Sequence, residues 1–196
     1  MRLVVATRNE HKLRELRELL PDHELAPLPD GVRLPPETAE TFEENALIKA
    51  CAAARATAAA AIADDSGIAA AALGGRPGVR SARYAGEGAS DEENLAKLLR
   101  EVPLDGDRRV AYVCVIAYVD PEGEERLFEG RCEGTLAESP RGTGGFGYDP
   151  AFIADELDDG RTMAELDPRE KGAISHRGRA ARALAAWLAE SGRAAA

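Results

Sequence analysis

The sequence has few of the residues that mark several large classes of protein. Its 196 residues include only three cysteines, and its 35 acidic residues outnumber 25 basic ones. Cys51, Cys114 and Cys132 are far apart and lack CxxC spacing, so we expect reduced thiols, mostly in the core, and no zinc or redox motif. A formal net charge of -10 disfavours nucleic acid or an anionic membrane as the main partner, because both attract basic proteins.

Long apolar runs and the motifs of nucleophilic hydrolases are also missing. No stretch approaches the ~20 apolar residues that a membrane helix needs, and Met1–Ala6 has no signal-peptide pattern, so we expect a cytoplasmic protein without a membrane partner. There is no Gly-x-Ser-x-Gly turn, and the three histidines do not form the HExxH motif of zinc proteases.

The chain does contain an alternation of strand and helix patterns. Its 44% apolar and 31% charged residues are typical of a folded globular protein, and we expect one domain over residues 1–196, with no separate linker. Short apolar runs predict strands at Leu3–Ala6, Ala61–Ala63, Arg109–Val119 and Glu125–Cys132. Helical periodicity and capping residues predict helices at Glu10–Leu20, about 42–59, after Ser90, and about 176–190. The predicted fold class is α/β with a mixed sheet.

The first polar segment that could carry chemistry is Thr7–Lys12, between the first strand and the first helix. The start of a helix offers free N–H groups and the positive end of the helix dipole, which together bind anions. Lys12 would add a full positive charge. The alternative is that Asn9 only caps the helix and Lys12 is solvated.

The second segment is Asp64-Asp65-Ser66-Gly67, directly after a short predicted strand. Ligands of α/β proteins bind beyond the carboxyl ends of strands, and carboxylates suit Mg²⁺. Because neighbouring side chains of an extended chain point to opposite faces, at most one of the two carboxylates should face the metal. The alternative is an acidic turn, for which these four residues are also well suited.

Two segments near the C-terminus complete the candidates. Gly142–Asp149 contains a formal G-x-G-x-x-G, but no strand precedes it and no helix follows, so we reject a dinucleotide-binding motif. Its Phe146 and Tyr148 could stack on a nucleobase or simply pack in the core. His176 and Arg177 would occupy the first turn of the last helix, where the helix dipole disfavours positive charge. A residue in an unfavourable place without an evident local compensation hints at function.

In their order along the chain, these segments resemble the inosine/xanthosine triphosphate pyrophosphatase family. The resemblance runs from about Leu3 to Leu188 and is carried by Ala6-Thr7-x-Asn9-x-x-Lys12-x-x-Glu15, Glu37-Thr38, Thr41-Phe42-x-Glu44-Asn45-Ala46-x-x-Lys49-Ala50, Ala63-Asp64-Asp65-Ser66-Gly67, Leu73-Gly74-Gly75-x-Pro77-Gly78-Val79-x-Ser81-Ala82-Arg83-Tyr84-Ala85-Gly86, Gly142–Pro150, Thr162-x-Ala164-Glu165-Leu166 and Glu170-Lys171-x-x-Ile174-Ser175-His176-Arg177. Each motif alone is weak, but the ordered set is specific.

The resemblance implies roles for some of the matching residues. Glu37 and Asp65 would bind Mg²⁺, and Asp65 would also prepare the attacking water. The implied phosphate contacts are Thr7, Asn9, Lys12, Lys49 and Ser66. The implied contacts to base and ribose are Phe146, Asp149, Lys171, His176 and Arg177. Arg8, Gly147 and Tyr148 complete the predicted substrate-binding set.

The resemblance also implies the fold and the reaction. The family has an elongated, two-lobed α/β fold around a long mixed sheet, with the active site in the cleft between the lobes, and its members are usually homodimers. The expected reaction is hydrolysis of ITP, dITP or XTP to the monophosphate and pyrophosphate, by attack of water on the α-phosphorus. Two alternatives stay open: a pyrophosphatase of modified pyrimidine nucleotides of the septum-inhibition type, and a nucleotide sensor that does not hydrolyse.

Overall fold

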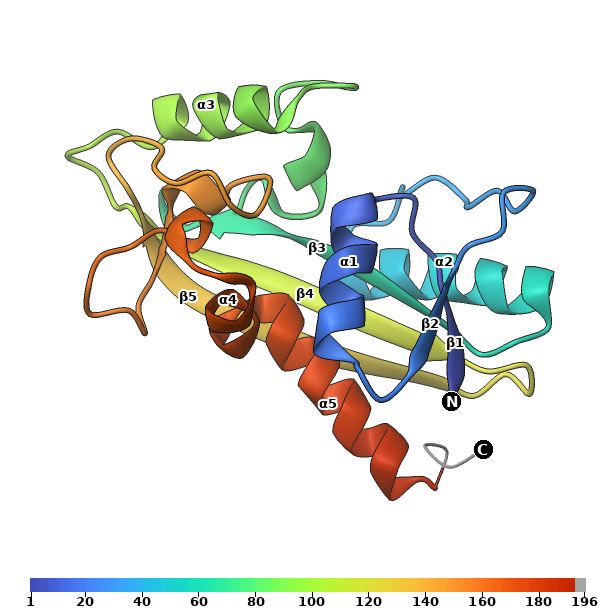
Figure 1. Cartoon of the computed structure of the whole chain (residues 1–196). Helices are drawn as coiled ribbons and strands as arrows, with labels where there is room; N and C mark the ends of the chain where they lie inside the picture. The colour runs from blue at the N-terminus through green and yellow to red at the C-terminus, as the bar shows by residue number, and fades with distance from the viewer. Residues whose placement is uncertain (193–196) are drawn as a thin grey trace. The chain divides into compact units, whose positions relative to one another are not determined.

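The computed structural model describes residues 1–192 and divides them into two compact units (Figure 1). The first unit consists of 1–65, 114–130 and the chain from 177 onward, and the second consists of 66–113 and 131–176. The chain therefore passes from one unit to the other within strands and at the start of the last helix, and no single linker separates them. A single domain over the whole chain stays a prediction.

The strands form one six-stranded sheet with the order β2-β1-β3-β4-β5-β6. Strand β1 (Arg2–Val5) pairs in parallel with β2 (Glu24–Pro27) and with β3 (Ala61–Ala70). Strand β5 (Glu125–Leu136) pairs antiparallel with β6 (Phe152–Ala154), and β4 (Arg109–Val119) lies between β3 and β5. The sheet is therefore mixed, which confirms the predicted fold class.

In the first unit, strand side chains alternate between two apolar layers. Leu3, Val5 and Ile62 pack with α1 (Glu10–Leu19) and α5 (His176–Glu190). Val4 and Ala63 pack on the opposite face, against the alanines of α2 (Phe42–Thr57). Figure 1 shows α1 and α2 on opposite sides of these strands. Because the side chains of these alanines are small, α2 can lie close to the strands.

The second unit has its own apolar core. Helix α3 (Asp91–Glu101) buries Leu95 and Leu98 in it, together with residues from β4, β5 and β6. Ser90 and Glu93 form the predicted reciprocal capping box at the start of α3. The short helix α4 (Pro168–Ile174) and four 3₁₀ segments complete the described elements. Three of these segments, 78–83, 149–151 and 163–165, belong to the loops around this core.

Four details differ from the sequence predictions. Strands β2 and β6 and helix α4 were not expected, because all three are short and two contain prolines. The prediction that the third strand ends at Ala63 is wrong, since β3 continues through the acidic pair to Ala70. Gly67 permits this continuation: a Cβ there would lie 2.4 Å from the carbonyl oxygen of Gly78 and from Ser81 Oγ. With no side chain at Gly67, Ser81 Oγ can approach the strand, where it accepts a hydrogen bond from Ile68 N.

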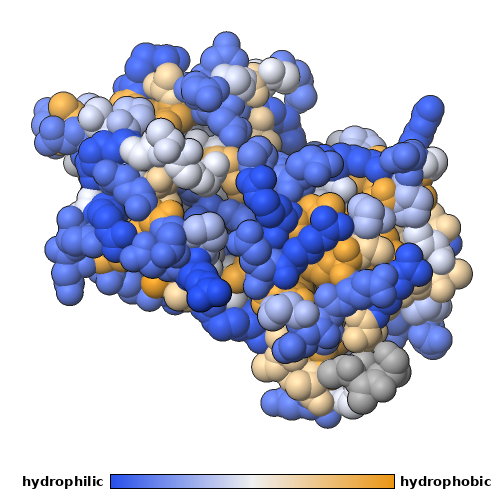
Figure 2. Space-filling model, viewed as in Figure 1, coloured by the Kyte–Doolittle hydropathy of each residue, from blue (hydrophilic) through white to orange (hydrophobic). Residues whose placement is uncertain are grey.

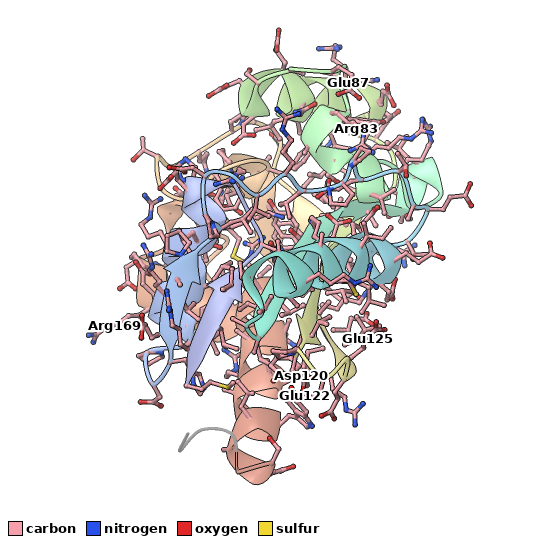
Figure 3. All side chains as sticks on the ribbon, turned by 90° about the vertical axis from the view of Figure 1, so that its right-hand side faces the viewer. Arg83, Glu87, Asp120, Glu122, Glu125 and Arg169 are labelled. Carbon is pink, nitrogen blue, oxygen red and sulfur yellow. The ribbon has the colours of Figure 1, made fainter. Side chains whose placement is uncertain are left out.

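The turn between β4 and β5 has the predicted form. Gly123 has a φ of +89°, its N–H donates to the carbonyl oxygen of Asp120, and Glu124 N donates to Asp120 Oδ1. Figure 3 shows the Asp120 and Glu122 side chains together at this turn. On the face drawn in Figure 2, hydrophilic residues cover most of the surface, in line with the 31% of charged residues. Among residues 1–192, no helix is both long and apolar enough to span a bilayer.

Candidate active site

Asp64 and Asp65 project from opposite faces of β3 because neighbouring strand residues alternate. Asp64 is on the face of Ile62, where α1 and α5 pack, and Asp65 is on the face of Ala63, where α2 packs. Both carboxylates are buried. The two side chains therefore point to opposite faces as predicted, although the pair lies inside the strand and not beyond its end. That they divide the functional roles stays a prediction.

On the first face, Asp64 is surrounded by cations. Lys12 Nζ lies 3.2 Å from Asp64 Oδ1, and Arg177 donates to Asp64 Oδ2 from Nε at 3.0 Å and from Nη2 at 2.9 Å. Arg177 Nη1 also donates to Glu15 Oε2 at 2.6 Å. Burial opposes ionisation of Asp64, but the attraction of Lys12, Arg177 and Lys49 outweighs it and holds the pKa of Asp64 below its usual value. Asp64 is therefore the charged anchor that positions Lys12 and Arg177.

The surroundings of Arg177 explain why a cation occupies the first turn of α5. Its side chain is 2% exposed, and removing one partner of such a buried pair typically costs about 3–5 kcal/mol. The ion pairs with Asp64 and Glu15 thus offset the unfavourable interaction of the Arg177 guanidinium with the helix dipole. Arg177 belongs to the first unit, with Asp64, and a contact to the base of the substrate stays a prediction.

On the second face, Lys49 brings the two predicted metal ligands together. Its Nζ donates to Glu37 Oε1 at 2.5 Å and to the carbonyl oxygen of Asp64 at 2.7 Å, and lies 3.8 Å from Asp65 Oδ1. Glu37 and Asp65 therefore contact the same ammonium group. The predicted proximity of Glu37, Lys49 and Asp65 is present in the structure.

The two carboxylates that share Lys49 have opposite pKa shifts. Burial opposes ionisation of Glu37, but the charge and hydrogen bond of Lys49, with the charge of Lys12, lower its pKa. Burial raises the pKa of Asp65, and the charges of Glu37 and Asp64 add to this effect against the attraction of Lys49 and Lys12. Asp65 is thus the better proton acceptor of the two, because its conjugate acid is the weaker one.

Asn45 holds the segment that carries Glu37. It is fully buried on α2, its Oδ1 accepts from Ala39 N at 3.1 Å, and its Nδ2 donates to the carbonyl oxygen of Ala39 at 3.4 Å. This pair of hydrogen bonds fixes the chain two residues beyond Glu37, within an otherwise irregular stretch before the helix. Asn45 therefore has a structural reason to occupy an apolar helix face.

The donor set of this cluster fits a magnesium ion. Within residues 1–192, no group of three or more histidine, cysteine or acidic side chains has the arrangement of a metal cage. Mg²⁺ does not need one, since it is commonly held by one or two carboxylates, with water and substrate phosphates in its other positions. Glu37 and Asp65 would supply two hard oxygen ligands, and their shared contact with Lys49 keeps them close.

The start of α1 has the form of an anion site and also a structural function. Asn9 Oδ1 accepts from His11 N at 2.9 Å and from Lys12 N at 3.2 Å, so Asn9 does cap the helix. Thr7, Arg8 and Asn9 line a cavity of about 270 Å³. Arg8 donates to the carbonyl oxygens of Leu28 and Val32, at 2.9 and 2.8 Å, and thereby fastens the loop after β2. Substrate contacts of Thr7, Arg8 and Asn9 stay predictions.

In the second unit, Asp149 connects several of the residues predicted to contact the base. Its Oδ2 accepts from Lys171 Nζ at 2.7 Å and from Phe146 N at 2.9 Å, and Tyr112 donates to its Oδ1 at 3.1 Å. Lys171 Nζ also lies 5.1 Å from the centroid of the Phe146 ring, within cation–π range. The loop and α4 are therefore held together by one buried carboxylate.

The other residues of the loop have different surroundings. Tyr148 is buried in the core of the second unit, and its hydroxyl donates to the carbonyl oxygen of Ser81 at 2.7 Å. Gly147 N donates to Asp91 Oδ2 at 2.7 Å. Tyr148 is therefore a core aromatic, and stacking on a base stays a prediction for Phe146. Ser66 is half-buried on β3, and its phosphate contact also stays a prediction.

Sequence reasoning gave no role to Tyr112, Glu15 or Asn45. Tyr112 is part of an apolar strand and looked like a core residue, whereas Glu15 is one of many charges on α1. The weak signal for Asn45 was an amide among alanines on the buried stripe of a helix. Tyr112 and Glu15 act through contacts with residues distant in the chain, and Asn45 acts through Ala39 in the irregular segment before α2. A linear pattern contains none of these contacts.

The sequence and the fold of this chain are similar to those of known proteins. Residues 3–187 match the sequence model of the Ham1 family. The chain is 53% identical over 186 residues to the dITP/XTP pyrophosphatase of Geobacter sulfurreducens, covering 91% of this chain and 92% of that one. The solved Staphylococcus aureus Ham1 protein has 41% identity and a TM-score of 0.87, covering 97% of this chain and 100% of its own. A HAM1 protein from Coxiella burnetii has 44% identity and a TM-score of 0.87, with coverages of 97% and 99%.

Proposed function

The chain belongs to the Ham1 family, and we propose that it hydrolyses deaminated purine nucleoside triphosphates such as dITP and XTP to the monophosphate and pyrophosphate. The resemblance inferred from the ordered motifs is thereby confirmed at the level of the family. Relatives named dITP/XTP pyrophosphatase support the substrate class. One observation carries the proposal. Glu37 and Asp65 both contact the Lys49 ammonium, and the neighbouring Asp64 holds Lys12 in an ion pair.

We assign Mg²⁺ to Glu37 and Asp65. A bound Mg²⁺ would neutralise charge on the phosphate oxygens and lower the pKa of a coordinated water. Asp65, whose pKa is raised by burial and neighbouring carboxylates, would accept the proton of the attacking water. Lys49 keeps both ligands in place, since its ammonium contacts each of them.

The cations of the first unit would hold the triphosphate. Catalysis of phosphoryl transfer rests mostly on positioning and charge stabilisation, so cations held in fixed places are of direct use. Lys12 is held by Asp64, and the N-terminus of α1 adds the positive end of its helix dipole. We assign Thr7, Asn9, Lys12, Lys49 and Ser66 to the phosphates, and leave Arg8 to its role in fastening the loop.

The network around Asp149 would recognise the base. Hypoxanthine and xanthine present an acceptor oxygen at C6, where adenine presents a donor. A Lys171 ammonium held by Asp149 can donate to that oxygen, and ATP would leave this donor without a partner at a cost in affinity. Phe146 would stack on the base, and His176 would border it.

The decisive experiment is a substrate panel. The purified protein is given ITP, dITP, XTP, GTP, ATP and dUTP with Mg²⁺, and pyrophosphate is measured separately from orthophosphate. We expect pyrophosphate from the first three, and loss of turnover on chelation of the metal without loss of the fold by circular dichroism. Orthophosphate as the sole product, a preference for dUTP, or binding without product would each contradict the proposal. Sedimentation of the same sample tests the homodimer that the family resemblance implies. We also assign the protein to the cytoplasm.

A further inference from the structure

We propose that Tyr112 is a positioning residue for base recognition, and that its hydroxyl sets the orientation of the Asp149 carboxylate. The inference rests on the proposed function and adds to it a residue outside the loop and helix that carry the predicted base contacts. Tyr112 lies on β4, and its side chain touches two of those predicted contacts, Asp149 and His176.

The ring of Tyr112 is fixed from both faces. It stacks on His176 with centroids 4.4 Å apart and planes 14° apart, and on Phe152 with centroids 4.3 Å apart and planes 20° apart. Tyr112 is 6% exposed and His176 is 5% exposed, so the three rings form a packed column in the second unit. A ring held in this way has one direction in which its hydroxyl can point, and Asp149 Oδ1 lies there at 3.1 Å.

The hydroxyl completes a set of donors that covers both oxygens of Asp149. Lys171 Nζ and Phe146 N occupy Oδ2, at 2.7 and 2.9 Å, while Tyr112 occupies Oδ1. The terminal torsion of an aspartate is soft, so donors on only one oxygen would let the carboxylate turn. With donors on both oxygens the plane of the carboxylate is set, and with it the positions of the Lys171 ammonium and the Phe146 backbone.

Close packing next to Asp149 supports this reading. A Cβ at Gly145 would lie far inside the van der Waals contact distance from Asp149 Oδ2, so the loop backbone lies directly against the carboxylate. A small rotation of Asp149 would therefore displace the loop that carries Phe146. A phenylalanine at position 112 would fill the same space and keep both ring contacts, but would not donate to Asp149.

The test compares Tyr112→Phe with Tyr84→Phe. Tyr84 is a matched control because its hydroxyl also donates to a carboxylate of the same unit, that of Glu101, outside the predicted base contacts. We expect Tyr112→Phe to raise KM for ITP about tenfold with kcat within about twofold, because the lost hydrogen bond serves base binding. KM for ATP should rise much less, because the adenine base gains no hydrogen bond from Lys171, so the preference for ITP over ATP falls several-fold. Tyr84→Phe should leave both substrates as in the wild type.

The outcomes separate this inference from the proposed function. A wild-type protein that does not convert ITP overturns the proposed function and the inference with it. A wild-type protein that does convert ITP, with a Tyr112→Phe variant of unchanged preference, overturns the inference alone. Equal losses with ITP and ATP would show that Tyr112 only supports the fold, and would overturn it too.

A second measurement tests whether Tyr112 and Asp149 act through one contact. The affinity for IMP is measured by calorimetry for the wild type, Asp149→Asn, Tyr112→Phe and the double variant, and folding is followed by circular dichroism. Residues acting through one contact are not additive, so the double variant should lose little more affinity than Asp149→Asn alone. Additive losses would overturn the proposal. If Tyr112→Phe does not fold, p-aminophenylalanine is placed at position 112; it keeps the ring and a donor at the same reach, so it should retain the ITP preference, and loss of that preference would overturn the proposal.

Discussion

At the scale of single residues, the acidic pair on β3 shows how one backbone step separates two roles. Asp64 is surrounded by Lys12 and Arg177, which lower its pKa, whereas Asp65 has a raised pKa beside Glu37. One carboxylate is thus held ionised as an anchor, and the other is left with a higher proton affinity. A chemical difference of this kind between adjacent residues comes only from the face on which each is buried.

The first prediction concerns Asp65 itself. Asp65→Asn keeps the size of the side chain but removes its charge and its ability to accept a proton. We expect turnover of ITP to fall at least ~10²-fold, the general cost of removing a group that stabilises the transition state. Pyrophosphate release under saturating Mg²⁺ measures it. Asp120→Asn, in the turn after β4, is the control and should keep wild-type turnover; near-normal turnover in Asp65→Asn would remove Asp65 from the mechanism.

At the scale of elements, the start of α1 combines a helix cap with a predicted phosphate site. Asn9 accepts from two backbone N–H groups, and Lys12 in the same turn pairs with Asp64. The same N–H groups that need a cap in the free protein are those that bind an anion. Stability and substrate affinity should therefore be separable by the choice of substitution.

The second prediction uses two substitutions of Asn9. Asn9→Ala should lower the free energy of unfolding by about 1 kcal/mol through loss of the cap. Asn9→Asp should keep the cap and the stability, but raise KM for ITP roughly tenfold, because a negative charge faces the triphosphate. Urea unfolding and initial rates measure the two effects. Ser90→Ala, which removes the cap of α3, should lose stability without a change in KM; an Asn9→Asp variant with normal KM would contradict the phosphate contact.

At the scale of the whole molecule, stability depends on groups that stay neutral in the core. Cys114 is fully buried, and burial, with the charge of Asp64, raises the pKa of its thiol to about 12 from an ordinary value of 9.0. All three cysteines are free thiols, and Cys114 and Cys132 are buried, so the prediction of mostly core thiols is confirmed. The free energy of unfolding should therefore depend on pH in the alkaline range, through the Cys114 thiol.

The third prediction gives the sign of that link. A thiol whose pKa is raised by folding contributes stability that is complete below pH 9 and is lost as the pH rises towards 12, because the unfolded chain releases the proton first. Between pH 8 and pH 10, the wild type should lose about 1 kcal/mol more than Cys114→Val. Urea unfolding at both pH values measures the difference. Equal losses in the two proteins would show that Cys114 does not carry the effect.

The chain's local patterns were sufficient for most of the elements. The capping residues Ser90 and Asn9 and the apolar stripes located the helices, and the doubly apolar run at 109–119 located β4. Strands β2 and β6 escaped prediction because each gains its identity from a neighbouring strand and not from its own few residues. The acidic pair was taken for the end of a strand because the contact of Gly67 with Gly78 and Ser81 lies beyond local patterns.

By itself, the sequence determined the fold class, the family and the chemical types present, because residue spacing and motif order are properties of the linear chain. Only the tertiary structure decided which charge meets which: that Glu37 and Asp65 share Lys49, and that Arg177 is bound to Asp64 and Glu15. Such pairings join residues up to 162 positions apart, and their strength depends on burial and on distances of a few ångströms. Neither quantity exists until the chain has folded.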